Sequence, residues 1–383
     1  MRIGIMLRHL NPHGTEMGTR IYTENIVNGI LETDHQNEYL LIYKDENLLG
    51  TFPTKENVTE TVLKIPTKLL WDQIGIPLLA RREKLDLIFN PKFSVPLLTK
   101  RKTVFVMHGM EWFVYPEVYK WFDVHYVKLA MPLYCKKADK IIAVSHLVET
   151  DMIKYMKVNK DKIKVIYEGY NKIFKPVNSN EFLNIIRNKY KLPGEFILYV
   201  GDIFPSKNFG RLVTAFNNLQ RKINIPLVVA GRKRWKYEDD MNLIEKFNLK
   251  NKILFVGRVP QKDLVGFYNL AKMLVFPSLD EGFGLPVIEA FACGCPVIAS
   301  GTGALPEVGG HAAYYIDPYN VYEIEKAMFE VLTNKSLRQS LIENGFEQAK
   351  KFSWENNVNQ TLKLFNDMAL EKPHTLHLKH GYS

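Results

Sequence analysis

Two glutamates separated by a glycine-containing loop are the residues best suited to chemistry in this sequence. Glu281 and Glu289 lie eight positions apart, with Gly282, Gly284 and Pro286 between them. Proline fits the first turn of a helix, where its missing N–H costs nothing. The first amides of such a helix have no partner within it, so they bind anions, and glycine lets a phosphate approach closely. The segment therefore predicts an anion site flanked by two carboxylates.

The free amides are expected at Gly284, Leu285 and Val287, and Glu289 is expected on the first turn of the helix. Carboxylates beside a bound phosphate are useful when they accept hydrogen bonds from hydroxyl groups of the same ligand. A sugar nucleotide has both phosphates and hydroxyls. The alternative is that Glu281 and Glu289 only complement the helix dipole, at about 0.3–1 kcal/mol each. That alternative leaves the two glycines and the proline unexplained.

The elements that must position these residues follow a regular alternation of short apolar runs and helix-length segments. This pattern is typical of parallel sheets covered by helices. Strands are expected at 2–6, 39–43, 87–89, 103–107, 140–144 and 164–167, and again at 196–200, 227–230, 253–256, 273–276, 296–299 and 313–316. Two doubly wound domains explain the repeat better than one. The carboxyl ends of their strands would face a common cleft, where ligands bind.

Composition excludes several classes of protein. The chain has 383 residues, of which 46% are hydrophobic and 24% charged, so it is neither disordered nor fibrous. Its 3 cysteines form no metal-ligand spacing. No run reaches the roughly 18 apolar residues that a membrane span needs. We therefore expect a cytoplasmic protein.

The nine residues from Glu281 to Glu289 resemble the E-x7-E signature of the retaining glycosyltransferases of family four, also called glycosyl transferases group one. Further segments similar to that family are Tyr199–Asn208, Val228–Arg232, Phe255–Val259, Gly303–Glu307 and Phe352–Glu355. The resemblance implies an α/β fold of GT-B architecture, in which two facing Rossmann-like doubly wound domains enclose a cleft.

The same resemblance assigns roles to the signature. Glu281 would hold hydroxyls of the donor sugar, and Glu289 the ribose hydroxyls of its nucleotide. Contacts to the sugar, the diphosphate and the base are implied for Gly284, Leu285, Arg258 and Val259. A carboxylate that accepts two ribose hydroxyls is also known from Rossmann-type sites in general.

A diphosphate needs cations, because its charge grows as the glycosidic bond breaks. Lys207 is the first candidate, since it follows an expected strand and aligns with a lysine of the family. Family members commonly have an arginine nearby, but Asp202 and Ser206 occupy those positions here. Arg232 is the candidate for the second charge, unless Lys207 and the helix dipole suffice. The alternative for both cations is a solvated surface position.

Two sites in the first half complete the expected centre. Gly18 lies in the segment His13–Tyr22, placed like a glycine-rich loop of the family that meets the donor phosphates; alternatively it is only a turn glycine. His108 ends an expected strand and precedes Gly109, so its ring should emerge at the cleft. It resembles the family histidine that contacts the reacting sugar, although a lone histidine is often structural.

The domain boundary is expected between Glu168 and Pro176, with a hinge at Gly169–Asn171. We assign residues 1–170 to an acceptor-binding domain, 171–353 to a domain that binds the nucleotide sugar, and 372–383 to a disordered tail with three histidines. We also expect a helix at about 354–371, which could pack back onto the first domain.

The expected activity is retaining transfer of a hexose from a nucleotide-diphosphate sugar to an acceptor hydroxyl, in polysaccharide or glycan synthesis. Glu281, His108 and Lys207 would be catalytic. The nucleotide sugar is a co-substrate, and no cofactor or metal is expected, since the sequence contains no Asp-x-Asp pair. The alternatives are a non-catalytic nucleotide-sugar binder and an epimerase or phosphorylase with the same fold.

The acceptor is expected to be a glycan or a lipid-linked glycan. Between Tyr115 and Lys140, aromatic residues including the four Trp121, Phe122, Tyr126 and Tyr134 are mixed with lysines. One hypothesis is peripheral contact with an anionic membrane, at its inner face. The other is a helix that packs its aromatic side chains inward. A net charge of +10 without a recognised motif gives no reason to expect nucleic acid as a partner.

Overall fold

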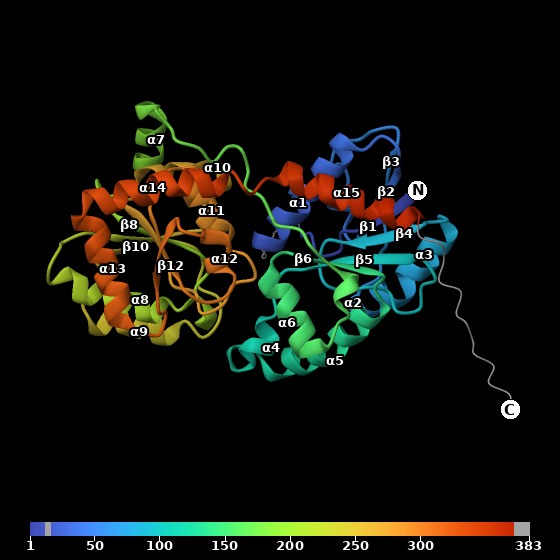
Figure 1. The fold of residues 1–383 in the computed structure, drawn as a ribbon, viewed down its shortest axis with the longest axis horizontal. Coiled ribbons are helices and arrows are strands. Elements are labelled where there is room, and N and C mark those ends of the chain that lie inside the picture. The colour runs from blue at the N-terminus through green and yellow to red at the C-terminus, as the bar shows by residue number, and fades with distance from the viewer. Residues whose placement is uncertain (12–16, 371–383) are drawn as a thin grey trace.

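The protein is described here by a computed structural model that covers residues 1–11 and 17–370. Two parallel sheets lie side by side, each covered by helices (Figure 1). The first has the order β3-β2-β1-β4-β5-β6-β7, and the second has the order β10-β9-β8-β11-β12-β13. The expectation of two doubly wound α/β domains is therefore confirmed.

The strands of the first sheet are β1 (Arg2–Met6), β2 (Glu38–Tyr43), β3 (Val58–Val62), β4 (Leu87–Asn90), β5 (Lys102–Met107), β6 (Lys140–Ala143) and β7 (Ile163–Val165). Those of the second are β8 (Ile197–Val200), β9 (Leu227–Ala230), β10 (Ile253–Gly257), β11 (Met273–Phe276), β12 (Val297–Ser300) and β13 (Ala313–Ile316). Only β3 was not expected. It is an edge strand with a single buried residue, Val58, so it lacks the apolar run that marks a central strand.

The helices of the first half are α1 (Met17–Thr33), α2 (Lys68–Leu70), α3 (Ile76–Arg82), α4 (Glu111–Val114), α5 (Trp121–Lys137) and α6 (His146–Met156). A π-helical turn, Trp71–Gly75, joins α2 to α3. The helices that follow are α7 (Asn180–Tyr190), α8 (Phe209–Gln220), α9 (Glu238–Lys246), α10 (Gln261–Leu270), α11 (Leu285–Ala292), α12 (Leu305–Gly309), α13 (Val321–Thr333), α14 (Lys335–Ala349) and α15 (Trp354–Leu370).

The last helix returns to the first half of the chain. In Figure 1, α15 runs beside α1. The Phe365 ring lies 5.1 Å from the ring of Phe89 on β4, and both residues are fully buried. Burial of this size stabilises by roughly 1.5–3 kcal/mol per large side chain. The expected histidine tail lies outside the described residues.

The two halves of the chain are in hydrophobic contact. Phe283 and Leu285, from the second half, belong to the buried cluster of the first half. Tyr167, Phe283 and Phe352 form an aromatic trio with ring centroids 5.5–6.2 Å apart. The interface is therefore a packed core, in which water is replaced by aromatic contacts.

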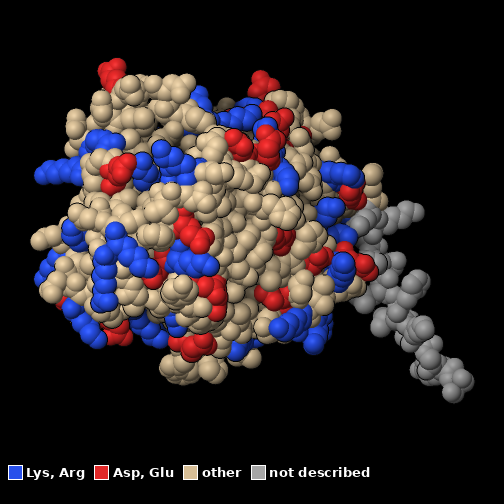
Figure 2. All heavy atoms as spheres, turned by 60° about the vertical axis from the view of Figure 1, so that its left-hand side comes forward, with Lys and Arg blue, Asp and Glu red and all other residues tan. Residues whose placement is uncertain are grey.

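Charges on the surface are mixed in sign. Figure 2 shows Lys and Arg side chains interspersed with Asp and Glu on the displayed face. Neighbouring charges of opposite sign partly cancel there, so the net charge of +10 gives that face no uniformly positive character.

The chain crosses between the halves twice, and the crossings touch each other. Tyr170 forms an isolated parallel bridge with Ser353. A Cβ added to Gly169 would lie 2.1 Å from the backbone nitrogen of Trp354. The segment Gly169–Asn171, where we expected a hinge, therefore lies in direct contact with the second crossing of the chain.

Replacing Gly169 with alanine is expected to destabilise the protein by about 1–3 kcal/mol, because backbone atoms have to move to admit the methyl group. The free energy of unfolding, measured by urea denaturation, tests this. Gly194→Ala is the matched control, since no atom lies within 4 Å of its added Cβ. Equal stabilities of the two variants would contradict the close packing of the crossings.

Candidate functional site

The candidate site lies where two neighbouring strands of the second sheet end. Lys207 follows β8 and Glu281 follows β11, which pairs with β8. The Lys207 Nζ donates a hydrogen bond to Glu281 Oε1, and the two side chains are only 18% and 13% exposed. Lys207 is therefore not a solvated surface cation, and the sheet brings these two predicted residues together.

The glycine loop beside this pair begins α11. Gly284 has φ of +110°, a conformation that glycine adopts without strain, and it caps the helix. Among the described residues, none accepts a hydrogen bond from the amides of Gly284 or Leu285. The prediction of a third free amide, at Val287, is wrong, because Val287 N donates to Gly284 O at 3.0 Å. Two open amides at a helix N-terminus remain suited to an anion.

Gly282 brings the loop against the first half of the chain. A Cβ at this position would lie 1.7 Å from the carbonyl oxygen of His108. Ser145, the N-cap of α6, accepts from Val148 N and also donates through Oγ to Gly282 O at 2.7 Å. Only glycine therefore permits this approach of the two sheets.

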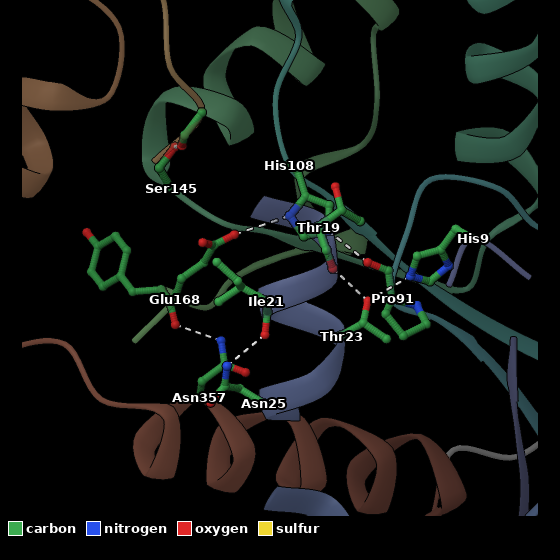
Figure 3. A network of polar contacts seen from close by, with 12 residues as sticks. His9, Thr19, Ile21, Thr23, Asn25, Pro91, His108, Ser145, Glu168 and Asn357 are labelled. Atoms are coloured by element: carbon green, nitrogen blue, oxygen red, sulfur yellow. Dashed lines mark hydrogen bonds and ion pairs between the residues drawn. The ribbon is translucent and has the colours of Figure 1, made fainter. Parts of the chain in front are cut away.

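His108 is placed differently from the expectation. Its ring does not emerge freely at the cleft, because Nε2 lies 2.8 Å from Pro91 O and Nδ1 lies 3.2 Å from Glu168 Oε1 (Figure 3). The Pro91 carbonyl only accepts, so Nε2 donates to it, while Nδ1 contacts the Glu168 carboxylate. Tyr22 packs edge-on at 4.8 Å. The part of His108 that meets the second half is its backbone carbonyl.

Glu289 is more buried than expected. It is the fifth residue of α11, so it begins the second turn instead of lying on the first. Its side chain is buried, and Oε2 accepts from Tyr268 Oη of α10 at 3.0 Å. Burial raises the pKa of the Glu289 carboxyl to about 8. Glu281 and Glu289 therefore do not flank the amides symmetrically.

Asp202, at a position where the family commonly has an arginine, contacts two arginines that follow β9. Its Oδ1 accepts from the backbone N of Arg232 at 3.0 Å, and its Oδ2 accepts from Arg232 Nη2 at 3.0 Å. Arg234 Nη1 lies 3.7 Å from the same carboxylate. Asp202 thus holds two guanidinium groups at the ends of β8 and β9, beside the strand end that leads to Lys207.

The remaining predicted residues lie farther out. Arg258 and Val259 follow β10 at the sheet edge, where Arg258 is exposed and Val259 is buried. Gly18 is the second residue of α1 and exposed, and no atom of the described residues lies within 4 Å of an added Cβ. His13, in the loop before it, lies outside the described residues.

Two acidic residues of the centre were missed. Asp280 is 7% exposed, and burial together with the charges of Glu111 and Glu281 raises its pKa to about 7. The Glu111 carboxylate lies over Gly109, and burial raises its pKa as well. Asp280 is next to Glu281 in the sequence, so the sequence alone could have identified it. Glu111 is recognisable only once the sheets are placed together.

Within residues 1–11 and 17–370, no group of three or more His, Cys, Asp and Glu side chains is arranged to hold a metal ion. None of the helices there combines the length and apolarity that crossing a bilayer requires.

Two parallel sheets, each covered by helices, with a lysine–carboxylate pair at the strand ends of the second sheet, have the architecture of the GT-B class of glycosyltransferases. Residues 184–348 match the model described as Glycosyl transferases group 1, and residues 20–172 match the model described as Glycosyltransferase Family 4. The chain is 32% identical to O-antigen chain mannosyltransferase B of Escherichia coli over 292 residues, which cover 75% of this chain and 76% of that protein. The chain belongs to this glycosyltransferase family.

Solved structures share the fold at low identity. Sucrose-phosphate synthase from Thermosynechococcus elongatus superimposes with a TM-score of 0.78 at 21% identity, covering 96% of this chain and 99% of that one. The Anabaena protein HepE, solved in complex with UDP-glucose, gives a TM-score of 0.77 at 16% identity, covering 96% and 100%. These likenesses show the fold, and the expected GT-B architecture is confirmed.

The raised pKa of Asp280 predicts a pH-dependent stability. Its pKa rises from 3.8 to about 7 on folding, so the folded state holds a proton that the unfolded state releases between those values. Stability contributed by this group is therefore lost as the pH rises through that window. Asp280→Asn should gain about 1–3 kcal/mol relative to wild type between pH 5 and pH 8.

Urea denaturation at the two pH values measures this gain. Asp161→Asn, at an exposed position, is the control and should show no such gain. Parallel pH dependences of wild type and Asp280→Asn would contradict the proposed cost of ionising Asp280.

Proposed function

We propose that this protein transfers a hexose, with retention and without a metal, from a nucleotide-diphosphate sugar to an acceptor hydroxyl. The observation that carries the proposal is the buried Lys207–Glu281 pair beside the open amides of Gly284 and Leu285. A cation and a helix N-terminus take the diphosphate, and the carboxylate takes sugar hydroxyls. No other ligand class in common use matches this combination as well.

The leaving group determines how the pair acts. As the bond from the anomeric carbon to the phosphate oxygen breaks, negative charge grows on the diphosphate. Lys207 has three N–H donors, so it can keep Glu281 Oε1 and also bind a phosphate oxygen. The Gly284 and Leu285 amides add donors that are fixed before the reaction, which is the effective way to stabilise developing charge.

The acceptor oxygen forms its bond to the anomeric carbon on the face from which the diphosphate departs. Its proton passes to the departing phosphate oxygen, so no carboxylate of the protein is needed as a nucleophile. Glu281 orients the sugar, and the His108 carbonyl marks the closest approach of the first half. Closure of the halves around the site excludes water, which limits hydrolysis of the donor.

The other residues serve the nucleotide in this proposal. Arg232, held by Asp202, supplies the second positive charge. Glu289 accepts the ribose hydroxyls in exchange for, or beside, the Tyr268 hydroxyl. Arg258 and Val259 border the base, and Gly18 lies near the phosphates.

The setting we propose is synthesis of a cell-surface polysaccharide. The relative with 32% identity is named as an O-antigen chain mannosyltransferase, which supports mannose as the donor sugar and a glycan as the acceptor.

Exposed aromatic side chains on α5 support a membrane-bound acceptor. Trp121 and Phe122 are 70% and 69% exposed, and Leu129 is 74% exposed. Tyr134 alone among the four aromatic residues is buried in the core. Three of the four therefore face outward beside lysines, as in helices that lie on an anionic membrane.

Variants at the site should separate catalysis from binding. Lys207→Ala is expected to lower kcat about 100- to 1000-fold, as loss of one charge-stabilising donor does. Glu289→Gln is expected to weaken donor binding about tenfold with a smaller effect on kcat, since its contacts are to the nucleotide. Sugar transfer from GDP-mannose and other nucleotide sugars, with calorimetric donor titration, measures both.

Lys250→Ala, on an exposed ion pair with Glu245, is the control and should behave as wild type. The proposal fails if Lys207→Ala and Glu289→Gln both retain wild-type kcat and donor affinity.

The aromatic residues of α5 should govern membrane binding. Wild type is expected to sediment with phosphatidylglycerol vesicles at low salt, and the double variant Trp121→Ser/Phe122→Ser to lose most of that binding, since each ring contributes roughly 1.5–3 kcal/mol on burial. Tyr322→Ser, at a 64% exposed aromatic residue of the second half, is the matched control. If wild type stays in the supernatant, the membrane hypothesis is wrong.

A further inference from the structure

A cavity of about 520 Å³ opens in the first half, away from the Lys207–Glu281 pair. It lies at the carboxyl ends of β1, β2 and β4, and the π-helical turn forms part of its wall. Its lining includes Arg8, His9, Lys68, Asp72, Lys92 and Phe93. This volume suits a ligand of one or two sugar rings, since small-molecule sites usually measure about 300–1,000 Å³.

Asp72 is the residue that marks the cavity as a built site. Its side chain is 3% exposed, and among the described residues its Oδ2 has no hydrogen-bond partner. Burial raises the pKa of this carboxyl, and the charge of Lys68, a hydrogen bond from Ser94 and the charge of Arg8 oppose the rise. A buried oxygen without a partner is costly, and a ligand hydroxyl that donates to it removes the cost.

Cations surround this carboxyl. Arg8 donates through Nη2 to Pro66 O at 3.3 Å, whereas its buried Nε has no partner among the described residues. Lys68 and Lys92 place their Nζ atoms 4.9 and 5.6 Å from the centre of the Phe93 ring. An aromatic face between two ammonium groups offers apolar contact to a sugar ring and positive charge to an anion beside it.

The pKa of His9 is sensitive to the positive charges around the cavity. Its pKa lies well below the usual value, chiefly because of burial and then because of Lys92, His108 and Lys68. The Thr23 hydroxyl donates to Thr19 O, so it accepts from His9 Nε2, and Nδ1 of the neutral ring is an acceptor.

The cavity is connected to the centre by one short segment. Pro91 O accepts from His108 Nε2 (Figure 3). The next two residues, Lys92 and Phe93, line the cavity. A ligand held by this wall therefore lies next to the residue whose carbonyl meets the second half.

We infer that this cavity binds a saccharide that carries a phosphate or diphosphate. Asp72 accepts a sugar hydroxyl, Phe93 contacts the ring, and Arg8, Lys68 and Lys92 neutralise the phosphate. The inference rests on the proposed glycosyl transfer, in which this ligand is the acceptor end. The phosphate belongs either to a free sugar phosphate or to a lipid-linked sugar.

The test uses the full chain carrying Lys207→Ala, so that the donor site does not contribute. The 1-phosphates of glucose, galactose, mannose and N-acetylglucosamine are titrated calorimetrically, each beside its uncharged sugar. At least one phosphate should bind about tenfold or more tightly than its free sugar, and Asp72→Asn or Lys92→Ala should each weaken it about tenfold or more. The controls Asp161→Asn and Lys250→Ala should leave it unchanged.

A polyprenyl-linked form of the sugar phosphate, in detergent micelles, distinguishes the two sources. Tighter binding than the free phosphate identifies a lipid-linked ligand, and equal binding identifies a free one. The inference is overturned if none of the phosphates binds, or if both cavity variants bind as tightly as their parent. Thermal unfolding verifies that the variants are folded.

The donor experiments distinguish a failure of the proposed transfer from a failure of the cavity assignment. If a sugar phosphate binds the cavity while no nucleotide sugar is used, the proposed transfer fails and the cavity assignment stands. If transfer proceeds and the cavity variants keep their acceptor KM, the cavity assignment alone fails.

Discussion

The approach of Gly282 to the His108 carbonyl is the constraint on which the candidate site depends. A side chain at position 282 would force the loop after β11 away from the end of β5. Because the loop reaches that strand end, Glu281 and Asp280 come close to Glu111 from the other half. The charges of these three carboxylates and of Lys207 then interact at low exposure. Burial is the main cause of the raised pKa values of Asp280 and Glu111, and repulsion between the neighbouring carboxylates adds to it. In the proposed reaction, a proton on Asp280 would lower the negative charge that an incoming diphosphate meets.

Two helix N-termini at the interface differ in whether their first amides have a hydrogen-bond acceptor. The first amides of α6 are already occupied, because the Glu307 carboxylate of the second half accepts from His146 N at 2.7 Å and from Leu147 N at 3.1 Å. This contact stabilises the closed arrangement by pairing an anion with a helix dipole across the interface. The amides of Gly284 and Leu285 at α11 have no such partner among the described residues. The protein thus satisfies one helix N-terminus with its own carboxylate and leaves the other open, at the place where the proposed mechanism puts a phosphate.

Local patterns in the sequence predicted the elements well, and the orientation of side chains at their ends less well. Every central strand follows from an apolar run, and the strand ends place Lys207 and Glu281 at one edge of the second sheet, but the ion pair between them was not predicted. The sequence around Glu289 did not reveal that Tyr268, 21 positions earlier, draws its carboxylate inward. Nor did it reveal that Glu168, 60 positions after His108, holds that ring. Such contacts depend on how distant elements pack, and a local pattern carries no information about that packing.

The first half combines two features that a lipid-linked saccharide would satisfy together. On α5, Phe122, Leu129 and Leu133 face outward, while Tyr134 is buried beneath them. The charge of Asp72 contributes to raising the pKa of Tyr134, so the buried face of α5 lies near the acid of the cavity. A helix that rests on a bilayer would therefore hold the cavity close to the lipid headgroups, where a saccharide phosphate is attached. In our proposal, both features serve one acceptor, whose lipid remains in the membrane while its sugar enters the cavity, in reach of the segment from Pro91 to Phe93.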